Sequence, residues 1–88
     1  MLNGVKVMNK FSCNGHDYTF SNSNFLTKLY DLDGNLLAQA EHYLEYYHAI
    51  FYDQEGQHMD LFDCERHENY FSSGADVAKW LASSHPEL

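Results

Sequence analysis

Two cysteine–histidine pairs carry the residue types best suited to metal binding or nucleophilic chemistry. Both pairs have the same spacing, Cys13 with His16 and Cys64 with His67. Thiolate and imidazole groups are ligands of structural zinc sites, so the two pairs together would supply a complete ligand set. Neither pair has the common CxxC or HxxxH form, and a long stretch of chain separates them. We therefore expect no metal or other cofactor, with Cys13 as a small core residue and Cys64 in a polar loop.

Catalysis by a cysteine nucleophile requires a base within reach and a third group that orients the base. His58 and His67 lie near Cys64 in the sequence, but no glycine-rich elbow or oxyanion element accompanies them. The sequence shows no signal-peptide pattern and no apolar stretch long enough to span a bilayer. These patterns predict a cytoplasmic protein that is not an enzyme, in which a disulfide between Cys13 and Cys64 is disfavoured.

An acidic tract between residues 53 and 68 carries more information about binding. Its carboxylates are Asp53, Glu55, Asp60, Asp63, Glu65 and Glu68, and its only cation is Arg66. Three carboxylate pairs have i, i+2 spacing, namely Asp31/Asp33, Asp53/Glu55 and Asp63/Glu65. On an extended strand this spacing places both groups on one side, about 6.6 Å apart. That distance is broadly the spacing of phosphates along a nucleic-acid strand, so such an edge would imitate DNA. The alternative for the first two pairs is a role in turns.

Tyrosine is the second binding signal. The seven tyrosines are Tyr18, Tyr30, Tyr43, Tyr46, Tyr47, Tyr52 and Tyr70, which are too many for a small core to bury. On an extended chain Leu44 and Ile50 share one face, while Tyr43 and Tyr47 share the other. Because the face of Leu44 and Ile50 is more aliphatic, we expect it to cover the core. Tyr43 and Tyr47 would then be exposed anchors for a protein partner.

The overall charge restricts the class of partner. The chain of 88 residues has 13 acidic and 5 basic side chains, which gives a formal charge of −8. This charge repels phosphate groups and anionic lipids, so direct binding to nucleic acid or to a membrane surface is disfavoured. A protein with a basic surface is favoured instead. The length predicts a single domain over residues 1–88, with one core and shallow sites.

The elements that position these residues begin with a hairpin. Alternating β-favouring residues lead into Asn14 and Gly15, and the alternation resumes at His16. Asn-Gly is the strongest two-residue turn signal, because both positions of a type I′ turn require a positive φ. The turn would place Cys13 opposite His16, and it would place Phe11 opposite Tyr18 on one face.

Later segments predict further strands. Residues 25–30 alternate and end at residues 31–35, whose composition is that of a turn. Residues 49–52 and 58–62 flank a similar connection at residues 53–56, so the two connections resemble copies of one hairpin turn. Residues 36–48 satisfy both helical and strand periodicity. We favour one long or bent strand that pairs with residues 25–30, and a second helix at residues 36–48 stays open.

The C-terminal segment predicts a helix. Ser73 and Asp76 have the spacing of a capping box, and the residue before Pro86 disfavours helical backbone, so the helix should end near Ser84. One apolar stripe on this helix is formed by Val77, Trp80 and Leu81, and we expect this face to pack against a sheet. The predicted fold class is therefore α+β, with hairpins in a mostly antiparallel sheet and one amphipathic helix packed on one face.

These features combine into a small, acidic, single-domain protein with no catalytic constellation. In overall profile, rather than in any motif, it resembles the anti-defence inhibitors of phages and mobile elements, the anti-CRISPR and anti-restriction proteins. The resemblance implies a stoichiometric inhibitor that occupies the basic DNA- or RNA-binding surface of a host defence nuclease complex. The alternatives are an immunity-type or antitoxin-type inhibitor of a toxin nuclease and a small zinc-stabilised adaptor. A homodimer also stays open.

Overall fold

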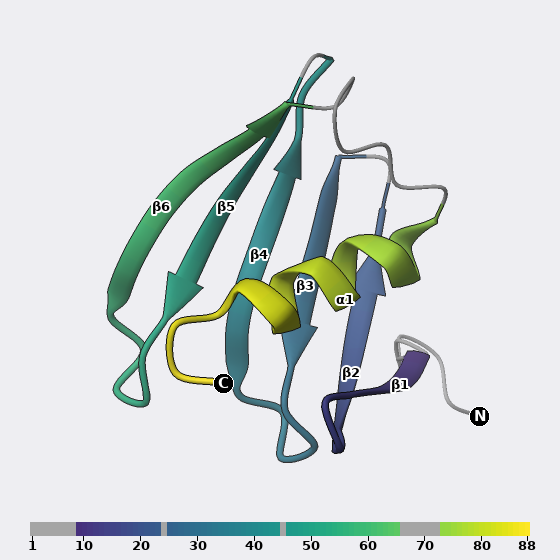
Figure 1. Ribbon diagram of the computed structural model, residues 1–88, viewed down its shortest axis with the longest axis vertical. Helices are drawn as coiled ribbons and strands as arrows, with labels where there is room; N and C mark the ends of the chain where they lie inside the picture. Colours follow the sequence, from purple (N-terminus) through teal and green to yellow (C-terminus); the bar gives the residue numbers. More distant parts are fainter. Residues whose placement is uncertain (1–8, 24, 45, 66–72) are drawn as a thin grey trace, which may run out of the picture.

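The computed structural model describes residues 9–23, 25–44, 46–65 and 73–88, with the side chains of residues 60–65 left out (Figure 1). Six strands precede one helix in the described part of the chain. Their bounds are β1 Asn9–Cys13, β2 His16–Asn22, β3 Leu26–Tyr30, β4 Leu36–His42, β5 Tyr46–Tyr52, β6 His58–Glu65 and α1 Gly74–Ser84. Among these residues, no helix has the length and apolar character that crossing a bilayer demands.

All six strands belong to one sheet in which each strand pairs antiparallel with the next one along the chain. The order β1 to β6 therefore places β1 and β6 on opposite edges. The helix α1 crosses one face of the sheet, in contact with β1, β2, β3 and β4 (Figure 1). This arrangement confirms the predicted α+β class with one C-terminal helix.

The first hairpin has the predicted turn and register. Asn14 and Gly15 both have positive φ values, 53° and 81°, as the type I′ turn requires. Cys13 pairs with His16, and Phe11 pairs with Tyr18. The rings of Phe11 and Tyr18 lie 5.6 Å apart, so this cross-strand pair contributes to the core.

The predicted duplication of a hairpin turn is also confirmed. Asp31 Oδ1 accepts the backbone N–H groups of Asp33 and Asn35 at 2.9 and 2.8 Å. In the second turn Asp53 Oδ1 accepts the N–H groups two and four residues later, both at 2.9 Å. Gly34 has a φ of 90° and its counterpart in the second turn has a φ of 78°. An aspartate at the first position and a glycine at the fourth therefore specify the same turn twice.

Residues 36–48 form neither a helix nor one long strand, so both interpretations of this segment were wrong. The chain reverses between β4 and β5, where the Tyr43 N–H donates to the Tyr46 carbonyl at 2.9 Å. β4 does pair with β3, as predicted for a strand in this segment. The buried positions of β4 are even-numbered and those of β5 are odd-numbered. One uninterrupted strand would keep the same parity on one face, so the change in parity reflects the turn.

Tyr47 is a core residue, which contradicts its predicted exposure. Only 2% of Tyr47 is exposed, and Ala49 and Phe51 on the same face are fully buried. Leu44, which was expected inside, lies in the turn and is 90% exposed. The aliphatic character of Leu44 and Ile50 was therefore a poor guide, because Leu44 is not part of β5. Tyr43 is 43% exposed, in line with its prediction.

Small sheet residues allow α1 to approach the sheet. Ala38, Ala40 and Ala49 are fully buried on the sheet, while the helix buries Val77, Ala78, Leu81 and Ala82. The start of α1 also lies close to the end of β2, which explains the glycine at position 74. A Cβ at Gly74 would collide with the side chain of Asn22. The Ser73 hydroxyl accepts the Asp76 N–H at 3.3 Å, as the predicted N-cap requires.

Candidate binding site at the acidic end of the sheet

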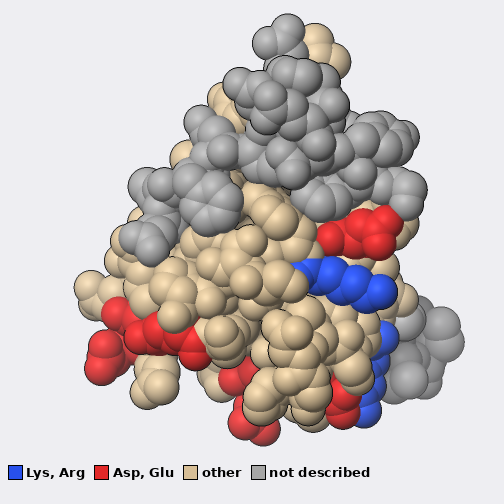
Figure 2. Space-filling view, viewed as in Figure 1, with Lys and Arg blue, Asp and Glu red and all other residues tan. Residues whose placement is uncertain are grey.

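Three turns and the C-terminal tail gather carboxylates at one end of the sheet. We call this region the acidic end, and define it by the turns at residues 14–15, 31–35 and 53–57, the adjoining residue Asp17 and the tail at residues 86–88. Its described carboxylate side chains are Asp17, Asp31, Asp33, Asp53, Glu55 and Glu87. Acidic groups are visible along this lower end of the molecule in the space-filling view (Figure 2). The clustering arises because alternate turns of an antiparallel sheet project from the same end.

The aspartates that begin the two duplicated turns have a structural role. Burial raises the pKa of the Asp31 carboxyl, but hydrogen bonds from the side chain and backbone of Asn35 and from the Asp33 N–H outweigh it. The pKa of Asp31 is therefore lowered, and the group stays ionised. Asp33 and Glu55 are exposed, and no ion pair with another described residue engages either one. These two carboxylates are available to a partner.

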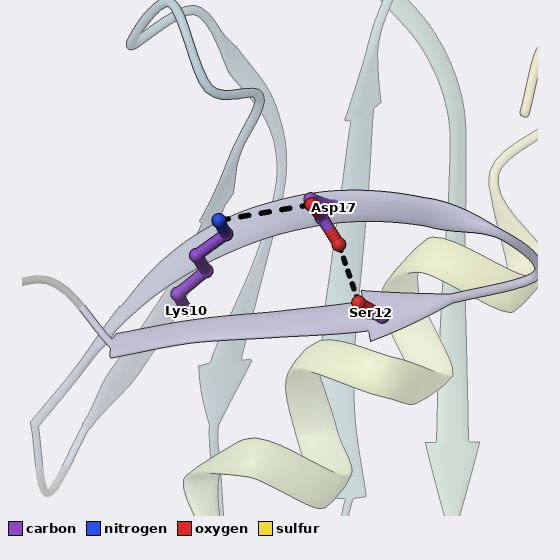
Figure 3. Close-up of polar contacts among 3 residues, drawn as sticks. All are labelled: Lys10, Ser12 and Asp17. Atoms are coloured by element: carbon purple, nitrogen blue, oxygen red, sulfur yellow. Dashed lines mark hydrogen bonds and ion pairs between the residues drawn. The ribbon is translucent and has the colours of Figure 1, made fainter.

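Asp17 is partly neutralised within its own hairpin. It accepts a short hydrogen bond from the Ser12 hydroxyl and forms an ion pair with Lys10, whose Nζ lies 3.7 Å from Asp17 Oδ2 (Figure 3). The Ser12 hydrogen bond, followed by the Lys10 charge, lowers the pKa of the Asp17 carboxyl. Both charged groups are well exposed, so the pair adds little to stability.

A cleft of about 660 Å³ lies within the acidic end. Its lining includes Tyr18, Leu37 and Tyr52, which provide apolar and aromatic surface, while Asp53 and Glu87 provide negative charge. No lysine or arginine is among the described residues that line it. The cleft therefore combines apolar walls with an electronegative rim.

Tyr18 is the most deeply buried tyrosine that lines this cleft. Only 5% of the residue is exposed, and within the described part of the chain its hydroxyl has no hydrogen-bond partner. No described side-chain oxygen is both fully buried and unsatisfied, so the Tyr18 hydroxyl keeps some exposure to solvent, and Tyr18 is one of the residues that line the cleft. Burial, and secondarily the nearby Cys13, raises the pKa of Tyr18. Burial, and secondarily Glu41, does the same for Tyr52. Both phenols are therefore neutral near pH 7.

His85 fixes one wall of the cleft. Its Nδ1 accepts the Glu87 N–H at 3.1 Å, so the ring proton resides on Nε2, which donates to the Tyr52 carbonyl at 3.0 Å. The ring also meets Phe51 edge to face, with centroids 5.5 Å apart. His85 is buried and fully bonded, so it attaches the tail to the end of β5.

The remaining members of the predicted acidic tract follow the edge strand. Asp60, Asp63 and Glu65 belong to β6, and Asp63 and Glu65 pair with His48 and Tyr46 of β5. The pair Asp63/Glu65 thus lies on extended backbone, as predicted, but at the end of β6 remote from the turn that holds Asp53 and Glu55. Their side chains and the whole of Glu68 lie outside the described residues.

The two cysteines lie on opposite edge strands of the sheet. Cys13 lies on the edge strand β1, where its Sγ is 3.4 Å from Ser83 Oγ, whereas Cys64 lies on the opposite edge strand β6. Cys64 is part of a strand rather than the polar loop that we expected. His67 lies outside the described residues, and within those described no group of three potential metal ligands is clustered. The sheet therefore separates Cys13 and His16 from Cys64.

The opposite end of the sheet has a different character. We call it the apolar end, and define it by Phe25, Tyr43 and Leu44. Phe25 is 76% exposed. Its carbonyl accepts the His42 N–H at 2.8 Å, so the connection between β2 and β3 lies beside the connection between β4 and β5. The ring of Tyr43 stacks on that of Tyr46 with centroids 4.7 Å apart. Tyr43, the predicted anchor, therefore lies far from the carboxylates of the acidic end.

A threonine–histidine contact beneath the apolar end has the geometry of a nucleophile and its base. Thr27 Oγ1 lies 2.9 Å from His42 Nε2 and 2.6 Å from Asn22 Oδ1. The hydroxyl donates its proton to Asn22, so it accepts from the His42 ring rather than being activated by it. Thr27 is also fully buried, so a substrate has no access to its hydroxyl. The three residues form a structural network.

No protein-family model, curated protein or solved structure shows significant similarity to this chain. The assignment of a function therefore depends on the chemistry of the two ends.

Proposed function

We propose that the protein is a non-catalytic, stoichiometric inhibitor that binds a basic, nucleic-acid-binding surface of a host defence nuclease complex. The observation that carries this proposal is the acidic end, where two identical turns present exposed carboxylates. Asp33 and Glu55 occupy the same position in their turns, and the hydrogen bonds of Asp31 and Asp53 hold the turn backbones. Such charges are preorganised, which lowers the entropic cost of binding.

The charge distribution supports a protein partner with a positive surface. The formal charge of −8 accelerates encounter with a basic surface and opposes encounter with a phosphate backbone. The edge strand β6 also contains Asp63 and Glu65 in its sequence. A row of carboxylates along an edge is the feature by which a protein would replace nucleic acid in a basic groove.

Charge reversal at the acidic end tests the proposal. The test variant replaces Asp33, Glu55 and Glu87 with lysine, which removes no hydrogen bond made by their carboxylates to other described residues. The control variant carries Phe25→Ser and Leu44→Ser at the apolar end. Wild-type protein immobilised on a resin should capture, from a lysate of cells that contain a defence nuclease, a nucleic-acid-binding protein that added double-stranded DNA displaces.

We expect the charge-reversed variant to lose at least about 100-fold in affinity for the captured protein at low salt, because several charge contacts become repulsive. The control variant should bind like the wild type. Equal capture by the charge-reversed variant, or capture that DNA does not disturb, would contradict the proposal. Capture of a toxin nuclease instead of a defence complex would assign the protein to the immunity type.

A further inference from the structure

The proposed acidic interface contains a cleft that surface charge alone does not explain. A solvated acidic surface needs no concavity, and yet the cleft has a volume of about 660 Å³ and an aromatic lining. This volume lies within the range of sites that hold small molecules or side chains. Tyr18 lines the cleft, and its hydroxyl has no hydrogen-bond partner among the described residues although the residue is more than nine-tenths buried.

We propose that this cleft receives an arginine side chain of the basic partner, with its guanidinium group bonded to the Tyr18 hydroxyl and to carboxylates at the rim. The inference rests on the proposed function, since it names the group that the acidic end would recognise. Tyr52 lines the cleft and is only half-buried, so its ring offers an aromatic surface on which a guanidinium plane stacks favourably. Leu37 provides apolar surface for the aliphatic part of the side chain.

The rim carboxylates have free acceptor capacity. Asp53 uses Oδ1 to bond its own turn, and its Oδ2 has no partner among the described residues. Glu87 is exposed, and its backbone N–H, rather than its carboxylate, bonds His85. A guanidinium has five N–H donors in a fixed fork, so one group can reach the tyrosine oxygen and a carboxylate together.

Other cations fit this lining less well. A divalent metal ion needs several converging oxygen ligands, but no three potential ligands are clustered among the residues that the structure describes. A lysine ammonium is a compact and strongly hydrated charge that gains less from an aromatic face. The neutral phenols described above keep both tyrosine hydroxyls able to accept or donate a hydrogen bond.

Titration of isotopically labelled protein with two short peptides, followed by amide NMR shifts, tests the inference. The peptides are acetyl-Gly-Arg-Gly-amide and the same peptide with lysine in place of arginine. We expect the arginine peptide to shift the amides of Leu37, Gln54 and Leu88, which line the cleft, and to bind at least about threefold more tightly than the lysine peptide.

The variant Tyr18→Phe removes only the hydroxyl. It should weaken binding of the arginine peptide about threefold to tenfold, as expected for one hydrogen bond, and it should leave the thermal melt unchanged because no described bond is lost. The matched control Tyr46→Phe makes the same chemical change at the other end of the sheet and should have no effect. Glu87→Gln should also weaken binding.

Two results would overturn the inference: shifts that spread over the exposed carboxylates without involving the cleft, or unchanged affinity in Tyr18→Phe. Either result leaves the proposed function intact if charge reversal at Asp33, Glu55 and Glu87 still abolishes capture of the partner. If charge reversal leaves capture unchanged while the arginine peptide still binds in the cleft, the proposed function fails and the cleft remains an arginine site.

Discussion

The acidic end and the apolar end arrange polar and apolar groups in opposite ways. At the acidic end, carboxylates face solvent and bond the backbone of their own turns, and aromatic side chains line a cleft between them. At the apolar end, Phe25 and Leu44 face solvent, while a polar network of Asn22, Thr27 and His42 lies beneath. One end therefore exposes charged groups to solvent, whereas the polar contacts near the other end are partly buried.

The difference shows that the position of a polar group decides its function more than its type does. A carboxylate in a turn can satisfy the backbone with one oxygen and keep the other for a ligand, because water surrounds it. The Thr27 hydroxyl is fully buried and has no such freedom, since it depends on Asn22 and His42 for its hydrogen bonds. Substitutions in the network beneath the apolar end should therefore change stability, and those of the exposed carboxylates at the acidic end should change binding.

The largest effect is expected at Tyr47, which lies inside the fold towards the apolar end. Tyr47→Ala should lower the free energy of unfolding by about 3–5 kcal/mol, because it removes a buried ring that contacts Trp80 and His42. Tyr43→Ala, four residues earlier and partly exposed, should cost less than about 1 kcal/mol. Chemical denaturation of both variants measures this difference. Similar losses in the two variants would contradict the placement of Tyr47 in the core and of Tyr43 at the surface.

A smaller effect is expected from the buried network. Thr27→Val keeps the shape of the side chain but removes the hydroxyl, so Asn22 and His42 each lose a partner. The free energy of unfolding should fall by about 1–3 kcal/mol. Thr27→Ser retains the hydroxyl and serves as the control, and it should recover the part of this loss that comes from hydrogen bonding. If valine is as stable as threonine, the network contributes nothing to the fold.

The smallest effect is expected at the acidic end and depends on pH. Because the folded protein lowers the pKa of Asp31 below its ordinary value of 3.8, the ionised group stabilises the fold above that value. This contribution is lost as the pH falls through the lowered pKa. Asp31→Asn should therefore cost about 1–2 kcal/mol at pH 7 and progressively less in acid.

Denaturation curves at several pH values measure this dependence. Asp33→Asn is the matched control, since Asp33 is exposed and its carboxylate bonds no described residue. It should change stability by less than about 0.5 kcal/mol at every pH. A cost for Asp31→Asn that stays constant into acid would mean that the charge of Asp31 is not what stabilises the turn.

Local signals in the sequence predicted most of the elements. Asn14 and Gly15 specified a turn through their backbone preference, and Ser73 and Pro86 limited the helix through a cap and a steric clash. The duplicated turns were predictable because Asp31 and Asp53 each follow a tyrosine and each precede a glycine by three residues. Each of these features depends on residues close together in the chain, so pattern and propensity were sufficient.

The faces of β5 were not predictable in the same way. Which side of β5 faces the helix depends on where β4 ends, and the reversal before Tyr46 contains no glycine or proline to mark it. The cleft was missed for a related reason, because Tyr18, Tyr52 and His85 come from three separate parts of the chain. The only local hint was that Tyr52 directly precedes a turn aspartate, as Tyr30 does.

The order of the strands has a consequence for how the chain folds. Each strand pairs with its immediate predecessor, so the sheet can extend one hairpin at a time as the polypeptide emerges during synthesis. Short separations between paired segments lower the entropy of loop closure and favour rapid formation. Only α1 must find partners distant in sequence, on β1 to β4. The apolar face of the sheet that α1 covers therefore stays open until α1 itself has been synthesised, which makes the docking of α1 the step that removes this apolar surface from water.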